Sequence, residues 1–334
     1  MRTINRGKAG FTLVELLTVI AIISLLIGIL IPSLSAARTQ AKATKTTAMF
    51  SSLGKAIEMF RNDNDRYPQS NGRTPFENQS SSGTPFLSGA QWLGMQMLGA
   101  DRKGFVKTTL INDKPTGSGG SGDGVINEQD WLDWYALTPA KNYARNATYM
   151  EPGARDVATP ETYQTEFAPG GAAPASLTAG TSVWNNSKLP FFVDSFGFPV
   201  LYYAANDGAE RPFSTGTRNT LVMGRYDQSD NIQFTGTTAA NGVNTAANED
   251  GWDLGGGLPH KIKELGWNPT QPNEQPAGDT FAHAFFNLQT FEATRQGATQ
   301  GKVWPRNPDT FILLSPGPDA IWGTHDDISN AASK

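Results

Sequence analysis

The stretch RGKAGFTLVELLTVIAIISLLIGILIPSL, from Arg6 to Leu34, decides how the chain is organised. A short basic start leads into a long apolar run, in which Glu15 is the only charged side chain. A helix needs about 20 consecutive apolar residues to cross the hydrocarbon core of a bilayer. The sequence therefore predicts a helix of membrane-spanning length with one acid near its start.

The residues that flank this run predict its orientation. Arg2, Arg6 and Lys8 precede it, so we expect the N-terminus to lie in the cytoplasm and the rest of the chain outside. A secretory signal peptide is the plain alternative, with the SAA at positions 35–37 as its cleavage site. However, the run is longer than the apolar part of a typical signal peptide, about 7–15 residues, and an acid within it is costly in lipid.

The segment GFTLVELL resembles the leader motif of type IV prepilins, in which a glycine, an aromatic residue and an acid precede an apolar run. The resemblance implies cleavage between Gly10 and Phe11 by a prepilin peptidase, followed by N-methylation of Phe11. It also implies that Glu15 pairs with the N-terminal amine of a neighbouring subunit and so sets the register of a filament. An ionisable group inside a membrane segment is expected to have a partner of this kind. The alternative is a lone glutamate whose carboxylate reaches the membrane surface.

Helical spacing of apolar residues continues beyond Pro32 as far as the polar segment NDNDRYP, positions 62–68. We therefore predict one helix from about Thr12 to Phe60, which Pro32 kinks but does not end. Four apolar residues of its second half are predicted to lie in a core: Met49, Phe50, Ile57 and Phe60. The expected divisions are a leader at 1–10, a transmembrane or filament-core helix at 11–31, an amphipathic half at 32–62 and a globular head at 63–334.

The head is predicted to contain many loops and short strands, because the chain has 35 glycines and 21 prolines. It has no cysteine, which excludes disulfides and thiolate metal sites. Residues 86–102 predict a short helix that ends near Gly99, and residues 189–206 predict a strand, a turn and a second strand. The latter segment resembles the D-P-W-G-x-P-Y-x-Y segment of type II secretion major pseudopilins, with Ser195 in place of the first proline and Phe196 in place of the tryptophan.

The C-terminal segment TFILLSPGPDAIWGTHDDISN contains a predicted strand at 311–314 and then an acidic loop. It resembles the calcium loop of major pseudopilins, expected here at 314–330. Calcium takes roughly six to eight oxygen ligands. The resemblance implies that the ligands come from Asp319, Asp327, Asp326 and Thr324, and from the backbone carbonyl of Leu314. The alternative is a solvated acidic tail, and Ala320 stands where the family has glycine.

A weaker calcium candidate is the segment GSGDGVINEQDW, positions 120–131 within a Gly-rich stretch. Asp123, Asn127 and Asp130 resemble the second half of an EF-hand loop, but the first half of that pattern lacks carboxylates. A simple Gly-rich turn before a helix remains the alternative.

Charge and motif content exclude other classes of protein. The formal net charge is −4, and removal of Arg2, Arg6 and Lys8 leaves 24 basic and 31 acidic residues, or −7, so no nucleic-acid partner is expected. None of the three histidines lies in a metal-binding or nucleophile motif, and no P-loop, G-x-S-x-G or dinucleotide fingerprint occurs. We therefore expect no enzymatic activity.

The expected fold is α+β and pilin-like, a long N-terminal helix packed on an antiparallel sheet. The resemblance covers about 11–68, 189–206 and 310–330, which leaves insertions at about 69–188 and 207–309. It implies a subunit of a type II secretion pseudopilus, held in the bacterial inner membrane with a periplasmic head. Its partners would be itself, other pseudopilins, prepilin peptidase and the inner-membrane secretion platform. The alternatives are a type IV pilin for adhesion or DNA uptake, and a membrane-anchored calcium-dependent binding module that does not polymerise.

Overall fold

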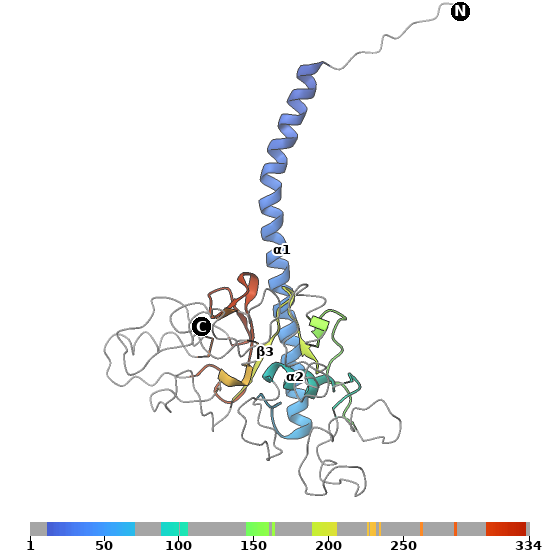
Figure 1. The fold of residues 1–334 in the computed structure, drawn as a ribbon, viewed down its shortest axis with the longest axis vertical. Helices are drawn as coiled ribbons and strands as arrows, with labels where there is room; N and C mark the ends of the chain where they lie inside the picture. Colours follow the sequence, from blue (N-terminus) through green and yellow to red (C-terminus); the bar gives the residue numbers. More distant parts are fainter. Residues whose placement is uncertain are drawn as a thin grey trace, which may run out of the picture. The chain divides into compact units, whose positions relative to one another are not determined.

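The computed structural model describes twelve parts of the chain. They are residues 12–70, 88–99, 101–105, 145–159, 162–163, 189–205, 226, 228–231, 234, 261–262, 284–285 and 305–331. The chain divides into two compact units, residues 1–44 and 45–334. The architecture is α+β, with a long N-terminal helix and a mainly antiparallel set of short strands (Figure 1).

The long helix, α1, runs from Leu13 to Asn64 without interruption at Pro32. It ends inside the polar segment that predicted its end, slightly beyond Phe60. The Asn64 side chain donates a hydrogen bond to the Phe60 carbonyl at 2.9 Å. Asp65 then adopts a left-handed conformation with φ of 54°, which cannot continue a right-handed helix.

One stripe of α1 is buried, and its residues recur every three or four positions, as expected for one face of a helix. It consists of Thr46, Phe50, Leu53, Ala56, Ile57 and Phe60. The predicted core positions Phe50, Ile57 and Phe60 are confirmed, and Met49 is half-buried against the same cluster. Every described residue from Thr12 to Lys42 is exposed.

The described strands form three small sheets, and the largest of these is antiparallel with strand order β3-β5-β7. Its strands are β3 (Leu201–Ala204), β5 (Phe311–Ser315) and β7 (Ile328–Ser329). An antiparallel pair joins β1 (Val157–Ala158) to β2 (Phe191–Phe192), and a parallel pair joins β4 (Lys261–Ile262) to β6 (Ile321–Trp322). Two short 3-10 turns, η2 (Gln228–Asn231) and η5 (Gly317–Asp319), complete the described elements.

Both faces of strands β3 and β5 are buried, apart from the half-buried Ala204, because their side chains alternate between two cores. Tyr202 and Leu313 lie in the core that α1 and the second helix share with the sheet. Tyr203 and Ile312 lie in the other core. That second core includes three aromatic residues from the predicted 207–309 insertion, namely Tyr226, Phe234 and Phe285. These three residues therefore belong to the packed core of the head.

The second helix, α2 (Gly89–Leu98), is buried along its whole length. Ser88 and Gln91 form a capping box at its start, and Gly99 ends it with φ of 79°, as the sequence predicted. Its glycines permit a close approach to neighbouring backbone. A Cβ atom at Gly94 would lie 2.1 Å from the Pro190 carbonyl oxygen.

The predicted strand, turn and strand at 189–206 are present, but the hairpin is short. Val193 pairs with Pro199 in a single bridge, and Val200 N–H donates to the Phe192 carbonyl at 2.9 Å. Beyond that point β2 pairs with β1 and β3 pairs with β5, so the two strands belong to different sheets. A hairpin signal in the sequence does not specify where the two strands separate.

We predict that Gly94→Ala destabilises the protein by about 1–3 kcal/mol, since backbone must move to admit the new methyl group. Gly54→Ala on α1 is the matched control, because a Cβ atom at that position would have Phe311 Cζ as its nearest neighbour, 4.0 Å away. Alanine favours helix over glycine by about 1 kcal/mol, so the control should be neutral or stabilising. Urea unfolding of the full chain in detergent, followed by tryptophan fluorescence, measures both. Equal effects of the two substitutions would contradict the close packing of α2.

Candidate functional site

The start of α1 is a capping box made by Thr12 and Glu15. The Thr12 hydroxyl accepts the Glu15 backbone N–H at 3.3 Å, and the Glu15 Oε2 accepts the Thr12 backbone N–H at 2.8 Å. The Thr12 hydroxyl also donates to the same carboxylate oxygen at 2.8 Å. The T-x-x-E spacing is the sequence signal for this motif, and it gives Glu15 a local role in addition to the predicted role in assembly.

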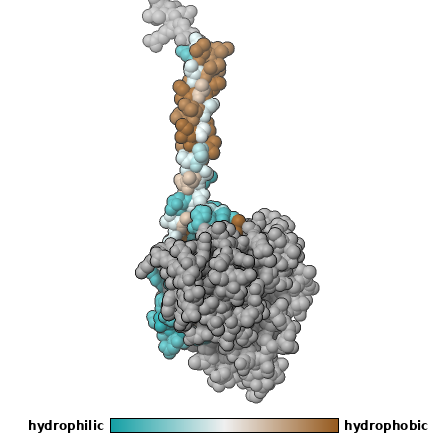
Figure 2. Space-filling view, turned by 90° about the vertical axis from the view of Figure 1, so that its left-hand side faces the viewer, coloured by the Kyte–Doolittle hydropathy of each residue, from teal (hydrophilic) through white to brown (hydrophobic). Residues whose placement is uncertain are grey.

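The first part of α1 is an exposed apolar surface (Figure 2). Apart from Met59, every large exposed apolar side chain in the described residues lies between Leu13 and Leu34. Among the described helices, α1 is the one long and apolar enough to cross a membrane, and none of its apolar window is buried. An apolar surface of this extent marks a site for lipid or for another protein.

The C-terminal loop between β5 and β7 brings together the four side chains that the sequence predicted as ligands. The Thr324 hydroxyl donates to Asp326 Oδ1 at 2.6 Å and lies 3.5 Å from Asp327 Oδ1. Asp327 Oδ2 accepts the Gly323 N–H at 2.8 Å, and Asp319 Oδ1 accepts the Ile321 N–H at 2.8 Å.

Burial and mutual repulsion perturb the acids of this loop. Burial, with a contribution from the neighbouring Asp319 and Asp326 carboxylates, raises the pKa of Asp327 to about 8. Burial also raises the pKa of Asp319, and the Asp326 carboxylate beside it acts in the same direction. Within the described residues, no ion pair joins these carboxylates to a basic side chain.

The backbone of the loop is tightly constrained. Ala320 adopts a left-handed conformation with φ of 64°, the conformation for which the family's glycine is suited. Gly317 has the same φ, and a Cβ atom there would lie 2.3 Å from the Asp326 carbonyl oxygen. Leu314 lies in the middle strand of the sheet, where its backbone pairs with Leu201 and Ser329. In the part of the chain that the structure describes, no three acidic or histidine side chains form a preformed metal site.

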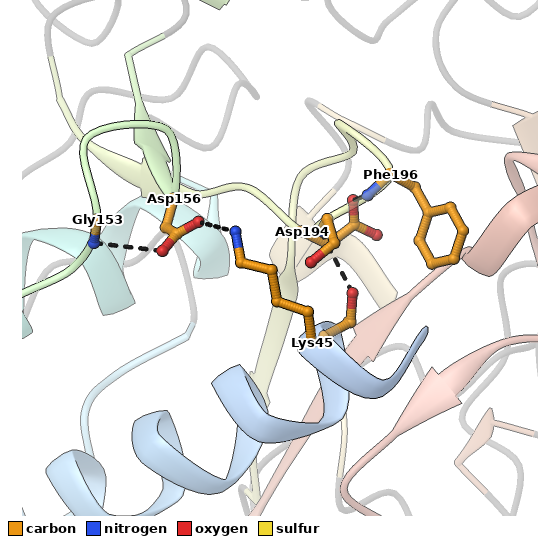
Figure 3. Close-up of polar contacts among 7 residues, drawn as sticks. Lys45, Gly153, Asp156, Asp194 and Phe196 are labelled. Atoms are coloured by element: carbon orange, nitrogen blue, oxygen red, sulfur yellow. Dashed lines mark hydrogen bonds and ion pairs between the residues drawn. The ribbon is translucent and has the colours of Figure 1, made fainter. Parts of the chain in front are cut away.

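Asp194 joins the turn after β2 to the start of the C-terminal loop. Its Oδ1 accepts the backbone N–H groups of Phe196 and Phe198, each at 2.8 Å (Figure 3). Its other oxygen accepts a hydrogen bond from the Ser315 hydroxyl, which in turn accepts the Gly317 N–H at 3.2 Å. Burial raises the pKa of Asp194, although the hydrogen bonds from Ser315 and from the turn oppose this shift.

Two contacts fix α1 to the head at the point where its buried stripe begins. Lys45 Nζ lies 3.0 Å from Asp156 Oδ1, and Asp156 also accepts the Gly153 N–H at 3.2 Å (Figure 3). The buried Thr46 hydroxyl accepts the Ser195 N–H at 3.3 Å. Sequence reasoning missed both contacts, because they join residues more than a hundred positions apart.

Several predicted site residues lie outside the described part of the chain. They are the processing residues Gly10 and Phe11 and the weaker calcium candidates Asp123, Asn127 and Asp130. Those predictions remain predictions.

Comparison with known proteins gives matches over the N-terminal region of the chain. Residues 5–31 match the family described as the prokaryotic N-terminal methylation motif. The chain is 50% identical over 62 residues to the type IV wide pilus major component PilA4 of Thermus thermophilus, covering 19% of this chain and 47% of that protein. No solved structure matches the chain significantly.

The other relatives are core proteins G of type II secretion systems. The protein of Aeromonas hydrophila is 35% identical over 64 residues, 19% of this chain and 45% of its own length. That of Escherichia coli is 36% identical over 71 residues, 21% of this chain and 48% of its own length. The chain thus spans just under half the length of these relatives. The N-terminal region is homologous to pilins and pseudopilins, which are structural proteins and not enzymes.

We predict that Asp194→Ala lowers the free energy of unfolding by about 2–5 kcal/mol, because it leaves two backbone N–H groups and the Ser315 hydroxyl without their acceptor. Asp194→Asn retains one acceptor oxygen and should cost less. Since the folded-state pKa of Asp194 is raised, its contribution to stability is full below about pH 4 and falls as the pH rises through that pKa. Urea unfolding from pH 4 to 7 should therefore show the unsubstituted chain losing stability relative to the Asp194→Asn variant. A difference in unfolding free energy between the two proteins that does not change with pH would contradict the raised pKa of Asp194.

Proposed function

We propose that this chain is a structural subunit of a type II secretion pseudopilus. Prepilin peptidase would cleave it between Gly10 and Phe11, and the mature chain would polymerise through α1 to support protein export. Its partners would be further copies of itself, other pseudopilins and the inner-membrane secretion platform. Before assembly it would sit in the bacterial inner membrane as a single-pass protein with its head in the periplasm.

The observation that carries this proposal is the exposed apolar half of α1 with a carboxylate in its first turn. The apolar surface from Leu13 to Leu34 suits the interior of a bilayer, or a filament core made of packed helices. The match of residues 5–31 to the N-terminal methylation motif supports processing immediately before that surface.

The geometry at Thr12 indicates how Glu15 would act. In the single chain its carboxylate is satisfied by the backbone N–H and hydroxyl of Thr12. Cleavage after Gly10 would create an α-amine on Phe11, next to that box. In a filament the amine of one subunit would approach the Glu15 carboxylate of another subunit and form an ion pair away from water. A filament register that left either charged group buried without the other would be strongly destabilised.

The choice between a pseudopilus and a type IV pilus rests on the head. The turn at 194–199 and the C-terminal loop resemble segments of major pseudopilins, which favours secretion. The 50% identity to a type IV pilus component supports the second candidate, a pilin for adhesion or DNA uptake. The polymerisation step is common to both.

We also propose that the C-terminal loop binds calcium. Asp319, Asp326 and Asp327 gather in one loop with the Thr324 hydroxyl, and oxygen donors of this kind suit calcium. No basic side chain among the described residues balances their charge. Bound calcium would supply that balance and hold the loop between β5 and β7. The remaining ligands would come from backbone carbonyls, with Leu314 as the sequence-based candidate.

We predict that the protein extracted from membranes begins with an N-methylated Phe11, as measured by the mass of its N-terminal peptide.

Glu15→Ala should leave this processing in place and lower the amount of sedimentable filament at least tenfold, because the charge pair that sets the register is lost. Ser24→Ala, which removes a polar group from the same apolar segment, is the matched control. Normal filament yield with Glu15→Ala would rule out the assembly role, and a mature chain that begins after Ala37 would rule out prepilin processing.

For calcium, we predict that a chelator lowers the melting temperature of the full chain by several degrees. Calcium at one hundred times its Kd contributes about 2.7 kcal/mol to stability. Asp319→Asn and Asp327→Asn should each remove the calcium-dependent shift. Asp65→Asn makes the same charge change at an exposed site outside the loop and should keep it. A melting temperature that is insensitive to calcium in the unsubstituted chain would exclude the site.

A further inference from the structure

Ser315 lies where the two sides of the C-terminal loop meet. It is the last residue of β5, and its backbone lies opposite Ile328, the residue that follows Asp327. Its hydroxyl accepts the Gly317 N–H at 3.2 Å and donates to the second carboxylate oxygen of Asp194. Because Ser315 is fully buried, water cannot replace either partner. Asp194 therefore holds Ser315 in place from outside the loop.

Gly317 carries this constraint to the predicted calcium ligands. A Cβ atom at Gly317 would lie 2.3 Å from the Asp326 carbonyl oxygen and 3.5 Å from Asp326 Oδ2, so the two residues pack closely. Asp319 ends the 3-10 turn that begins at Gly317. A shift of Ser315 or Gly317 would therefore move two of the three carboxylates. Loss of groups that orient metal ligands in this way typically lowers metal affinity by about 10–100-fold.

The other side of Asp194 leads to α1. Its Oδ1 accepts the N–H groups of Phe196 and Phe198, each at 2.8 Å, which fixes the turn that contains Ser195 (Figure 3). The Ser195 N–H donates to the hydroxyl of Thr46 at 3.3 Å, and Thr46 is fully buried. All of these residues belong to the larger of the two compact units. A continuous route of hydrogen bonds thus joins the C-terminal loop to the helix.

From this route we propose that calcium bound in the C-terminal loop strengthens the contact between the head and α1 at Thr46. Asp194 and Ser315 are the positioning residues that couple the two sites. The inference rests on the proposed calcium site. Coupling of this kind is reciprocal, so the contact at Thr46 raises the affinity for calcium by the same factor.

The C-terminal loop is the end of the route that a ligand can change. No basic side chain among the described residues pairs with Asp319, Asp326 or Asp327, and their like charges repel one another. A divalent cation removes this repulsion. Calcium therefore stabilises the arrangement in which Gly317 packs against Asp326, and in that arrangement the route to α1 is intact.

The last step of the route is specific to this chain. In the major pseudopilin segment that residues 194–199 resemble, proline stands at the position of Ser195, and proline has no N–H group. A turn with that proline cannot donate to the helix at this position. The resemblance of the C-terminal loop to a calcium loop therefore does not by itself predict the coupling.

The first test measures hydrogen–deuterium exchange of the full chain in detergent, with calcium or with a chelator, at single-residue resolution. We expect saturating calcium to slow exchange of the Ser195 N–H by about two- to tenfold, the worth of one hydrogen bond. Ser315→Ala should abolish this effect at saturating calcium, because it breaks the route. Ser329→Ala is the matched control, since its hydroxyl accepts the Ala331 N–H at 3.0 Å and lies outside the route.

Calorimetric titration with calcium tests the reciprocal effect. Thr46→Val keeps the shape of the buried side chain and removes the acceptor for the Ser195 N–H. It should raise the Kd for calcium by about two- to tenfold, although Thr46 lies on α1 and not in the loop. Thr44→Val makes the same change at an exposed position, where the hydroxyl donates to the Gln40 carbonyl at 2.9 Å, and should leave the Kd unchanged.

The outcomes separate the coupling from the calcium site itself. If the unsubstituted chain binds calcium but the Ser195 N–H exchanges equally with and without it, the coupling is overturned and the calcium site stands. An unchanged Kd in Thr46→Val leads to the same conclusion. A chain that binds no calcium would overturn both. Should Ser315→Ala fail to fold, exchange in the unsubstituted chain and the Thr46→Val titration still decide. Both measurements use unassembled chains, so a failure to polymerise would alter neither result.

Discussion

The packing of one stripe of α1 against the β3-β5-β7 sheet is the contact on which the rest of the head depends. The helix contributes residues from Thr46 to Phe60, and the sheet contributes alternate residues such as Tyr202 and Leu313. A small sheet of short strands is not stable unless a face is covered. Here α1 and α2 cover one face, and aromatic residues of the 207–309 segment cover the other. The same helix that carries the apolar surface therefore also organises the head.

The elements that the sequence predicted well are those with local signals. The periodic apolar residues of α1, the end of α2 and the apolar run of β5 each lie within a short window of sequence. The second core was not predictable in this way. Tyr226, Phe234 and Phe285 are far apart in the sequence and have no regular spacing, and only tertiary packing brings them to the sheet. The parallel pair of β4 and β6 was missed for the same reason, because two-residue strands carry no periodicity.

The candidate site shows the same division between local and long-range information. The turn-rich sequence and the resemblance to major pseudopilins placed Asp319, Thr324, Asp326 and Asp327 in one loop, where the structure brings them together. The sequence did not reveal that Asp194, more than a hundred residues earlier, anchors the start of that loop through Ser315. A single buried carboxylate thus orders the turn after β2 and the loop after β5. Asp194 accepts hydrogen bonds from the turn, and Ser315 links Asp194 to the Gly317 N–H in the C-terminal loop. Loss of either Asp194 or Ser315 would therefore disturb both segments.

Ser195 stands where the major pseudopilin segment that it resembles has proline, and the structure shows what the serine contacts. Proline has no N–H group to donate. Here the Ser195 N–H donates to the buried Thr46 hydroxyl on α1, so the substitution creates a direct link between the turn and the helix. One residue before Thr46, Lys45 pairs with Asp156 next to β1. The ion pair is exposed, and such pairs contribute about 0–1 kcal/mol. The buried hydrogen bond is therefore the stronger constraint on where along α1 the head begins.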